Sequence, residues 1–408
     1  MPPSRRQILR RRRAAVFAAV AVVLGTVFYL PMTLLAPLSG VAAVASAPEV
    51  TAQPAAALEW PTLGASAVGA IDYPGILGTG GVETAAPIAS ITKIVTALVV
   101  LDAKPLKLGD SGPDIDFTAK DVAIREKYRA VNGKVEPVNA GMTLTQRQVM
   151  DVMLVESANN YAESLATWAY GSMDEFLSAA DDWLARNNLE STSIIEPTGM
   201  SPSNVSTASD LVALGKIALA NPVVSAIVGT EAETVPVIGE ITNSNALLGV
   251  KGIRGIKTGT LDEAGACLLF AADYEVGGET VTIVGAVLGG VDHKTINAQV
   301  TTLLEDVEQA FHDVTLATAG ESFASYTTAW GETVELVAAE DARVVVWGDT
   351  PVTFTMTADD VGLGTKGDDV GMATYTVGDE TFTVPLELGA TISDPGPLWR
   401  LTNPGALF

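Results

Sequence analysis

Residues 90–103 read SITKIVTALVVLDA, and this stretch decides how the largest part of the chain folds. Lys93 and Asp102 are its only charged residues, so it is too apolar for a helix that lies on a protein surface. Pro105 ends the helical pattern. The sequence therefore predicts a helix that is buried through the centre of a domain.

Two capping boxes indicate further helices downstream. Thr145 and Gln148 form one of them, at the start of a helix expected over residues 146–155. Ser172 and Glu175 form the other, at the start of a helix that ends near residue 187. We therefore expect the middle of the chain to be helical.

Runs of β-branched and apolar residues indicate a sheet around these helices. The run 66–73, the turn signal Pro74-Gly75 and the apolar pair 76–77, which leads into Gly78, Gly80 and Gly81, together predict a hairpin. Three later runs predict neighbouring antiparallel strands, over residues 256–260, 266–274 and 280–289. A closing helix over 297–311 completes an α+β domain, in which helices cover an antiparallel sheet.

The first fifty residues indicate export. Six arginines between positions 5 and 13 precede an uncharged run over 14–48. A helix over 14–30 would be about 26 Å long, close to the ~30 Å hydrocarbon core, so it can remain as a membrane anchor. The alternative is a cleaved signal peptide, because Ala43-Val44-Ala45 supplies a small-x-small site before Ser46. In both cases the residues after 50 lie outside the cytoplasm, either membrane-tethered or secreted.

Changes in composition divide the chain into four parts. Residues 1–45 are the basic start with its signal or anchor, and residues 46–58 are an Ala/Pro-rich spacer. Residues 59–312 form the α+β domain, and residues 313–408 form a small, acidic, all-β domain of short runs and Asp/Gly turns. The C-terminal tail has no pattern of a second membrane anchor.

Charge and metal-ligating residues exclude several classes of function. A net charge of −24 argues against binding to nucleic acid, which requires a basic surface. One cysteine, Cys267, and two histidines, His293 and His312, allow neither a disulfide nor a Cys/His metal cluster. We interpret Cys267 as a small buried hydrophobe and His293 as a loop residue that follows a strand. No metal is expected.

Ser90 and Lys93 carry the first chemical signal. Their spacing puts a hydroxyl and an amine on one face of the predicted helix, one turn apart. A serine needs a neighbouring base to act as a nucleophile, and burial lowers a lysine pKa toward the working range. A lysine on a buried helix also costs stability unless something uses it. The pair therefore favours a nucleophile with its base.

Two further patterns supply polar groups. In Ser157-Ala158-Asn159 the hydroxyl can relay a proton to a leaving group, and the amide can bind a peptide group and orient a lysine. In Lys257-Thr258-Gly259-Thr260 the lysine brings positive charge, the hydroxyl can meet a carboxylate, and the glycine permits close backbone approach. Alone, each pattern is typical of an ordinary helix end or strand end.

Together the three patterns are specific. SxxK, SxN and KTG each occur once, in that order, with 67 residues from Ser90 to Ser157 and 100 from there to Lys257. This set is the signature of penicillin-binding proteins and β-lactamases. The segments ETAAPIASITKIVTALVVLD and GIRGIKTGTLDEAGACL resemble the low-molecular-weight, serine-type D-Ala-D-Ala carboxypeptidases (peptidase S11-like). The resemblance spans residues 60–310, and Leu261 departs from it where a second threonine is common.

The resemblance implies a fold, a reaction and a set of site residues. The fold is that of β-lactamases and DD-peptidases, and the reaction removes the terminal D-alanine from peptidoglycan stem peptides through an acyl-enzyme on Ser90. Backbone N–H groups of Ser90 and Thr260 would form the oxyanion hole. The implied catalytic residues are Ser90, Lys93, Ser157 and Asn159, and the implied substrate-binding residues are Lys257, Thr258, Gly259 and Thr260. β-Lactam antibiotics would be covalent inhibitors, and no cofactor is needed.

Two other functions stay open from the sequence. A β-lactamase would share the motifs but needs a carboxylate that activates water, and Glu196 lies 39 residues after Ser157. The EPTGM context of Glu196 and the additional β domain favour the carboxypeptidase. A non-catalytic wall-binding scaffold would be expected to have lost at least one of the three motifs.

Overall fold

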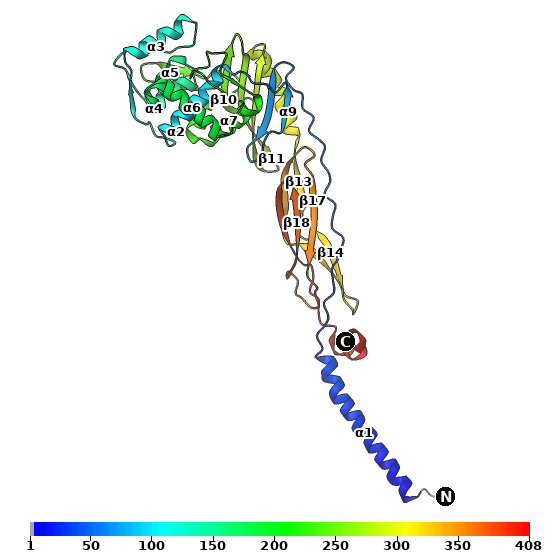
Figure 1. Cartoon of the computed structure of the whole chain (residues 1–408). Coiled ribbons are helices and arrows are strands. Elements are labelled where there is room, and N and C mark those ends of the chain that lie inside the picture. The colour runs from blue at the N-terminus through cyan, green and yellow to red at the C-terminus, as the bar shows by residue number, and fades with distance from the viewer. Residues whose placement is uncertain (1–3) are drawn as a thin grey trace. The chain divides into compact units, whose positions relative to one another are not determined.

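The computed structural model describes residues 4–408, and they form two compact units (Figure 1). One unit is continuous in sequence and covers residues 56–312. The other combines the chain up to residue 55 with residues 313–408. The segment before the first unit therefore groups with the C-terminal residues.

A five-stranded antiparallel sheet forms the centre of the unit 56–312. Its strand order is β10-β11-β12-β2-β3, with β10 at one edge. The strands are β10 (Ile253–Leu261), β11 (Gly265–Val276), β12 (Glu279–Gly290), β2 (Ala65–Ala70) and β3 (Gly78–Gly81). The three runs predicted as neighbouring antiparallel strands are confirmed.

The predicted hairpin is confirmed, and its second strand lies in the glycine-rich end of the predicted segment. It covers the glycine-rich residues 78–81 rather than the apolar pair 76–77. The indole of Trp60 lies against this strand, and a Cβ atom on Gly78 or Gly80 would come within 2.8 or 2.6 Å of it. Glycines are therefore required in this strand because the indole of Trp60 packs against it. Strand propensities, which disfavour glycine, do not predict such a strand.

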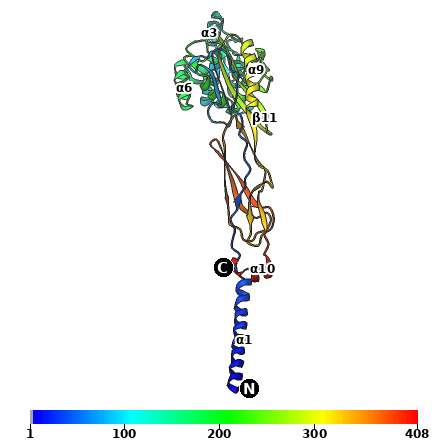
Figure 2. The same cartoon turned by 90° about the vertical axis from the view of Figure 1, so that its right-hand side faces the viewer.

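Helices cover the sheet and form a layer beside it. The helices of this unit are α2 (Thr92–Ala103), α3 (Ala119–Ala130), α4 (Gln146–Leu154), α5 (Asn159–Tyr170), α6 (Met173–Arg186), α7 (Ala208–Ala220), α8 (Pro222–Val228) and α9 (His293–Gln309). Helix α7 packs on β12 and β2, and α9 packs on β11 and β12. α9 runs along the side of the sheet away from α6 (Figures 1 and 2). The predicted α+β fold class is confirmed.

Helix α2 is the central helix that the sequence predicted. Ten of its twelve residues are buried, which no surface helix would allow. The α-helix begins at Thr92, however, because residues 89–91 form a 3-10 turn in which Ala89 has a φ of +46°. Ser90 thus lies in a tight turn immediately before the helix.

Short strand pairs connect the helical elements. They are β4 (Ala86–Pro87) with β7 (Val205–Ser206), β5 (Asp114–Asp116) with β6 (Thr143–Thr145), and β8 (Ala232–Val235) with β9 (Gly239–Thr242). The predicted capping box at Thr145 is present: its hydroxyl accepts from the Gln148 N–H at 3.3 Å, and the Gln148 side chain accepts from the Thr145 N–H at 3.0 Å. At Ser172 only half of the predicted box forms, in which the hydroxyl accepts from the Glu175 N–H at 3.2 Å. The caps fix where α4 and α6 begin.

The second unit is built on a six-stranded sheet with the order β1-β14-β15-β19-β18-β17. Its strands are β1 (Val44–Ala45), β14 (Ser322–Thr327), β15 (Thr333–Ala338), β17 (Val352–Ala358), β18 (Asp369–Val377) and β19 (Glu380–Leu388), and β13 (Phe311–Ala317) pairs with β16 (Ala342–Trp347). An apolar cluster that includes Phe323, Tyr326 and Tyr375 fills its interior. The unit also contains α1 (Arg5–Leu34) and the short α10 (Gly396–Thr402).

The segment after α1 is part of this sheet. In β1, Val44 pairs with Ser325 and Ala45 with Ala324. The N–H of Ser46 donates to the carbonyl of Phe323 at 2.9 Å. Residues 44–46, where the predicted signal or anchor meets the predicted spacer, therefore have regular backbone partners.

We expect the chain trimmed to residues 56–312 to fold on its own, because these residues contain a complete sheet, its covering helices and their shared core. Near-UV circular dichroism and a single cooperative thermal transition would report this. Loss of the transition in the trimmed chain, with the full chain intact, would show that residues 313–408 are needed for the fold.

Candidate active site

Two glycines allow the backbone to crowd around Ser90. Gly199 has a φ of +85°, and a Cβ atom there would lie 1.9 Å from the carbonyl oxygen of Ala89. A Cβ atom on Gly259 would lie 2.9 Å from the carbonyl oxygen of Ile88 and 3.2 Å from the Ser90 nitrogen. The loop at 199 and strand β10 therefore hold the turn that carries Ser90 from two sides.

Lys93 is completely buried and directed at Ser90. Its Nζ lies 3.0 Å from the Ser90 Oγ, 2.7 Å from the Asn159 Oδ1 and 2.6 Å from the carbonyl oxygen of Thr198. Burial, and then the charge of Lys257, lower the pKa of Lys93 well below its ordinary value. A deprotonated amine within hydrogen-bonding distance of a serine hydroxyl can act as its general base.

Glu196 organises the loop that supplies one of these acceptors. Its Oε1 accepts from the N–H of Gly199 at 2.7 Å and from the amide of Asn204 at 2.9 Å. Its Oε2 accepts from the N–H and the hydroxyl of Thr198, at 2.8 and 2.6 Å. Both carboxylate oxygens are thus occupied by the loop, and the loop holds the Thr198 carbonyl against Lys93.

Lys257 and Thr258 lie on the edge strand β10. Lys257 is 2% exposed, and burial followed by repulsion from Lys134 lowers its pKa to about 7. The hydroxyl of Thr258 lies 2.6 Å from the hydroxyl of Ser244. Ser244 carried no motif signal, because its role depends on a contact across 14 residues of sequence.

The segment around Lys134 also borders the site, although no sequence motif indicated it. The carbonyl of Lys134 accepts from the N–H of Asn159 at 2.8 Å, and a Cβ atom on Gly133 would lie 2.8 Å from the Asn159 amide nitrogen. The Lys134 Nζ pairs with Glu156 at 2.9 Å. Its charge also lowers the pKa of Lys93, but less than burial and the charge of Lys257 do. Three lysines therefore act on one another electrostatically.

Ser157 is buried in a left-handed conformation with a φ of +64°. Among the described residues, no hydrogen bond joins its hydroxyl to Ser90 or Lys93. Asn159 follows two residues later as the first residue of α5 and is 2% exposed. The site thus connects Ser90, Lys93 and Asn159 directly. Ser157 lies two residues before Asn159 and has no direct bond to Ser90 or Lys93.

His293 was wrongly interpreted as a loop residue. It is the first residue of α9, and its Nε2 lies 2.7 Å from the hydroxyl of Thr260 on β10. Burial, and then the charge of Lys257, lower its pKa. Cys267 is fully buried in β11, as predicted.

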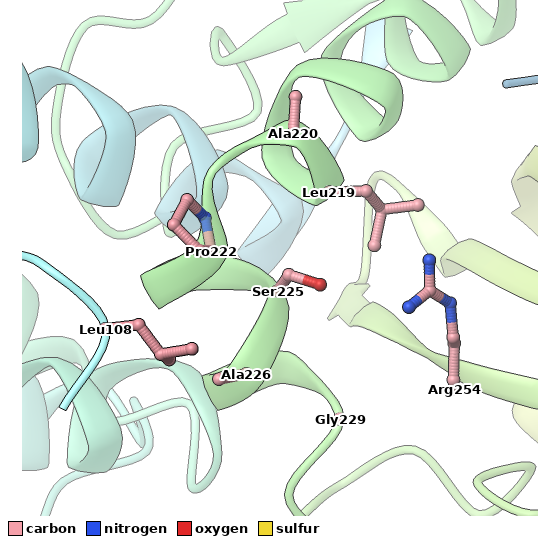
Figure 3. A pocket seen from close by; sticks show the side chains of 8 residues that line it. All are labelled: Leu108, Leu219, Ala220, Pro222, Ser225, Ala226, Gly229 and Arg254. Carbon is pink, nitrogen blue, oxygen red and sulfur yellow. The ribbon is translucent and has the colours of Figure 1, made fainter. Parts of the chain in front are cut away.

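A cavity of about 540 Å³ opens elsewhere in the same unit (Figure 3). Leu108, residues of α7 and α8, and Arg254 line it. None of the motif residues takes part, and Arg254 is paired with Asp273 at 3.1 Å. The cavity therefore does not belong to the site around Ser90.

Among residues 4–408 no group of three His, Cys, Asp or Glu side chains could hold a metal ion.

A family model described as D-alanyl-D-alanine carboxypeptidase (peptidase S11) matches residues 56–289. The D-alanyl-D-alanine endopeptidase of Pseudomonas aeruginosa is 35% identical over 191 residues, which are 45% of this chain and 58% of that protein. The D-alanyl-D-alanine carboxypeptidase DacF of Bacillus subtilis is 26% identical over 232 residues, which are 55% of this chain and 56% of that protein. The match thus spans a little over half the length of these two relatives.

Solved structures show the same fold. The crystal structure of the Streptomyces K15 DD-transpeptidase aligns with a TM-score of 0.55 at 25% identity, over 61% of this chain and 98% of that one. Penicillin binding protein 5 from Haemophilus influenzae aligns with a TM-score of 0.58, over 86% of this chain and 99% of that one. At 18% identity the second likeness concerns the fold alone.

We expect Lys257→Met to raise the melting temperature, because the buried amine costs stability. The folded-state pKa of about 7 lies below the ordinary 10.5, so between these values the unfolded chain binds more protons and the free energy of unfolding rises with pH. The variant's advantage should therefore be largest below pH 7 and shrink toward pH 10. Thermal unfolding across this range tests it, with Lys120→Met at an exposed position as the matched control. An advantage that is constant with pH would contradict the prediction.

Proposed function

Because the chain belongs to the D-alanyl-D-alanine carboxypeptidase family (peptidase S11), we propose that it removes the terminal D-alanine from peptidoglycan stem peptides through an acyl-enzyme on Ser90. The observation that carries the proposal is the buried Lys93 amine, 3.0 Å from the Ser90 hydroxyl. Its lowered pKa favours the neutral form that a base requires.

In the first step Ser90 Oγ attacks the carbonyl carbon between the two D-alanines, and its proton passes to Lys93. Negative charge develops on the carbonyl oxygen. The N–H groups of Ser90 and Thr260 would stabilise it, and one such donor is typically worth about 10²- to 10³-fold in rate. Gly259 supports this arrangement, because a side chain there would press on the Ser90 nitrogen.

In the second step the carbon–nitrogen bond breaks, and the leaving amine must gain a proton. Lys93 returns the proton that it took from Ser90. The Ser157 hydroxyl, which has no bond to Lys93 in this structure, would have to approach the amine to act as relay. D-Alanine leaves, and the remaining peptide stays as an ester on Ser90. A water molecule then attacks the ester and gives a proton to Lys93. Lys93 passes this proton to the Ser90 oxygen as the ester bond breaks, and the shortened peptide leaves as a carboxylic acid. Asn159 would keep the amine of Lys93 oriented throughout, at 2.7 Å.

Substrate capture would fall to Lys257 and Thr258. A carboxylate that binds beside Lys257 favours its protonated form, so binding would raise its pKa from about 7. The hydroxyl of Thr258, oriented by Ser244, can donate to the same carboxylate. By the same geometry a β-lactam would acylate Ser90, which supports β-lactams as covalent inhibitors.

The geometry around Glu196 does not favour a β-lactamase. That activity requires a carboxylate that is free to activate water, whereas both oxygens of Glu196 accept hydrogen bonds from its own loop. The scaffold function is also less well supported, because Ser90 and Lys93 keep a productive distance. Retention of a fluorescent penicillin would separate the three: no label for a scaffold, rapid loss for a β-lactamase and slow loss for a carboxypeptidase.

We further propose that α1 stays attached as a membrane anchor. It is thirty residues long and apolar enough to cross a membrane. The small-x-small site at 43–45 overlaps β1, and Val41 exchanges two backbone hydrogen bonds with Val361. The nearly buried guanidinium of Arg400 donates to the carbonyl of Ala36 at 2.6 Å. Cleavage before Ser46 would remove all of these contacts from the β unit.

Ser90→Ala should abolish covalent penicillin labelling and D-alanine release, because it removes the covalent route. Lys93→Ala should lose nearly as much activity as Ser90→Ala, since general-base assistance is worth about 10²- to 10⁴-fold in rate. Lys257→Met should mainly raise the KM and leave Ser90 competent. Intact-protein mass spectrometry after brief penicillin exposure, with D-alanine release, measures all three. A normal adduct on Ser90→Ala would show that the nucleophile is misassigned.

The anchor proposal predicts that the native protein sediments with membranes and that its intact mass includes α1. External protease should reach residues 56–312. Arg400→Ala should increase cleavage near residue 45, whereas Arg343→Ala, at an exposed pair in the same unit, should not. A soluble wild-type product that begins at Ser46 would overturn the anchor while leaving the catalytic assignment intact.

A further inference from the structure

We propose that His293 is a positioning residue that holds the Gly259–Thr260 edge of β10 in the geometry required for acylation of Ser90. The inference rests on the proposed function, since Thr260 is assigned there to the oxyanion hole. His293 belongs to none of the three motifs, and its contact lies 33 residues away in sequence.

The sheet brings the histidine to this edge. Thr260 pairs with Ala266 on β11, and Ala266 pairs with Gly290 at the end of β12. Thr260 and Gly290 are therefore at the same level, two strands apart, or about 10 Å. Asp292 then caps α9 by accepting from the N–H of Thr295 at 2.7 Å. His293, as the first helical residue, is the side chain that reaches back across β11 to the edge strand.

The turn that carries His293 is itself closely packed. A Cβ atom on Gly290 would lie 2.1 Å from Ile296 and 3.2 Å from the carbonyl oxygen of Ala266. A Cβ atom on Gly265 would lie 2.4 Å from the carbonyl oxygen of Gly290. The imidazole is therefore mounted on rigid backbone, whereas the Thr260 side chain is exposed and would rotate freely without a partner.

The imidazole acts on both residues of the edge. Its Nε2 is 2.7 Å from the Thr260 hydroxyl, and the backbone of Gly259 is close enough to oppose the lowering of its pKa. Gly259 lies against the Ser90 nitrogen, so a small shift of this edge changes the space in which the carbonyl oxygen of the substrate must lie. Loss of the imidazole should therefore slow acylation more than it weakens substrate binding.

Protonation provides a readout that a purely structural contact lacks. The charged groups that act on the ring are Lys257 from β10 and Asp292 on its own helix, and Lys294 acts on Asp292 in turn. Burial and Lys257 favour the neutral ring, which offers one nitrogen as an acceptor. Below the pKa both nitrogens are donors, so the Thr260 hydroxyl can only accept. The state of the ring and the orientation of Thr260 are thus coupled.

The test compares penicillin acylation and D-alanine release in four variants of the full chain. His293→Leu should lower the acylation rate about 10-fold or more, with an unchanged melting temperature, and His293→Gln should restore most of it because an amide can still bond to Thr260. Thr260→Val should cause a similar loss, and the double variant His293→Leu/Thr260→Val no greater one. Equal rates in His293→Leu and the wild type, or additive losses in the double variant, would overturn the proposal.

A spectroscopic arm separates this proposal from the proposed function. The chain has two histidines, so ¹⁵N-histidine NMR gives two pairs of ring signals, and His312→Gln identifies the pair from His293. Thr260→Val should shift the His293 signals and move their pH midpoint, whereas Thr260→Ser should leave both close to the wild type. Absence of penicillin labelling in the wild type would refute the function alone. Unchanged ring signals in Thr260→Val would refute the contact.

Discussion

The buried amine of Lys93 is the constraint on which the rest of the site depends. An amine removed from water must find acceptors within the protein. Lys93 finds three of them, on the turn at Ser90, at Asn159 where α5 begins, and at the carbonyl of Thr198. These groups come from three separate segments, so satisfying one amine fixes α2, α5 and the 196–204 loop against one another. The same burial lowers the pKa of the amine, so the packing requirement and the catalytic property have one cause.

Because the nucleophile must lie where these segments meet, the backbone around it has little space. Gly199 and Gly259 are required for that reason, and Ala89 adopts a φ of +46° in the turn between them. Such conformations persist only when the surroundings determine them. Glu196 provides part of that surrounding structure, because it accepts hydrogen bonds from the N–H groups of Thr198 and Gly199. A carboxylate that the sequence offered as a water-activating base thus has a structural task.

Local signals allowed much of the fold to be predicted from the sequence. The apolar run of α2, the caps of α4 and α6, and the β-branched runs of β10, β11 and β12 all depend on neighbouring residues. The features that the sequence did not reveal depend on residues that are far away in sequence. Strand β3 exists because glycines fit Trp60, and His293 and Lys134 take part through contacts with β10 and α5. The motif residues Ser90, Lys93 and Lys257 could be named because the pattern was already known, whereas their partners follow no pattern in sequence.

The chain order explains why the sequence gives no sign of β1. Its partners in the sheet begin at residue 322, so about 280 residues separate β1 from β14. The continuous unit 56–312 can fold as soon as it has been synthesised, but the sheet of the other unit must wait for its last strand, β19. Residues 36–46 therefore remain without partners until synthesis is almost complete. A two-residue strand has little local propensity to reveal it, and its stability comes from the sheet that it joins.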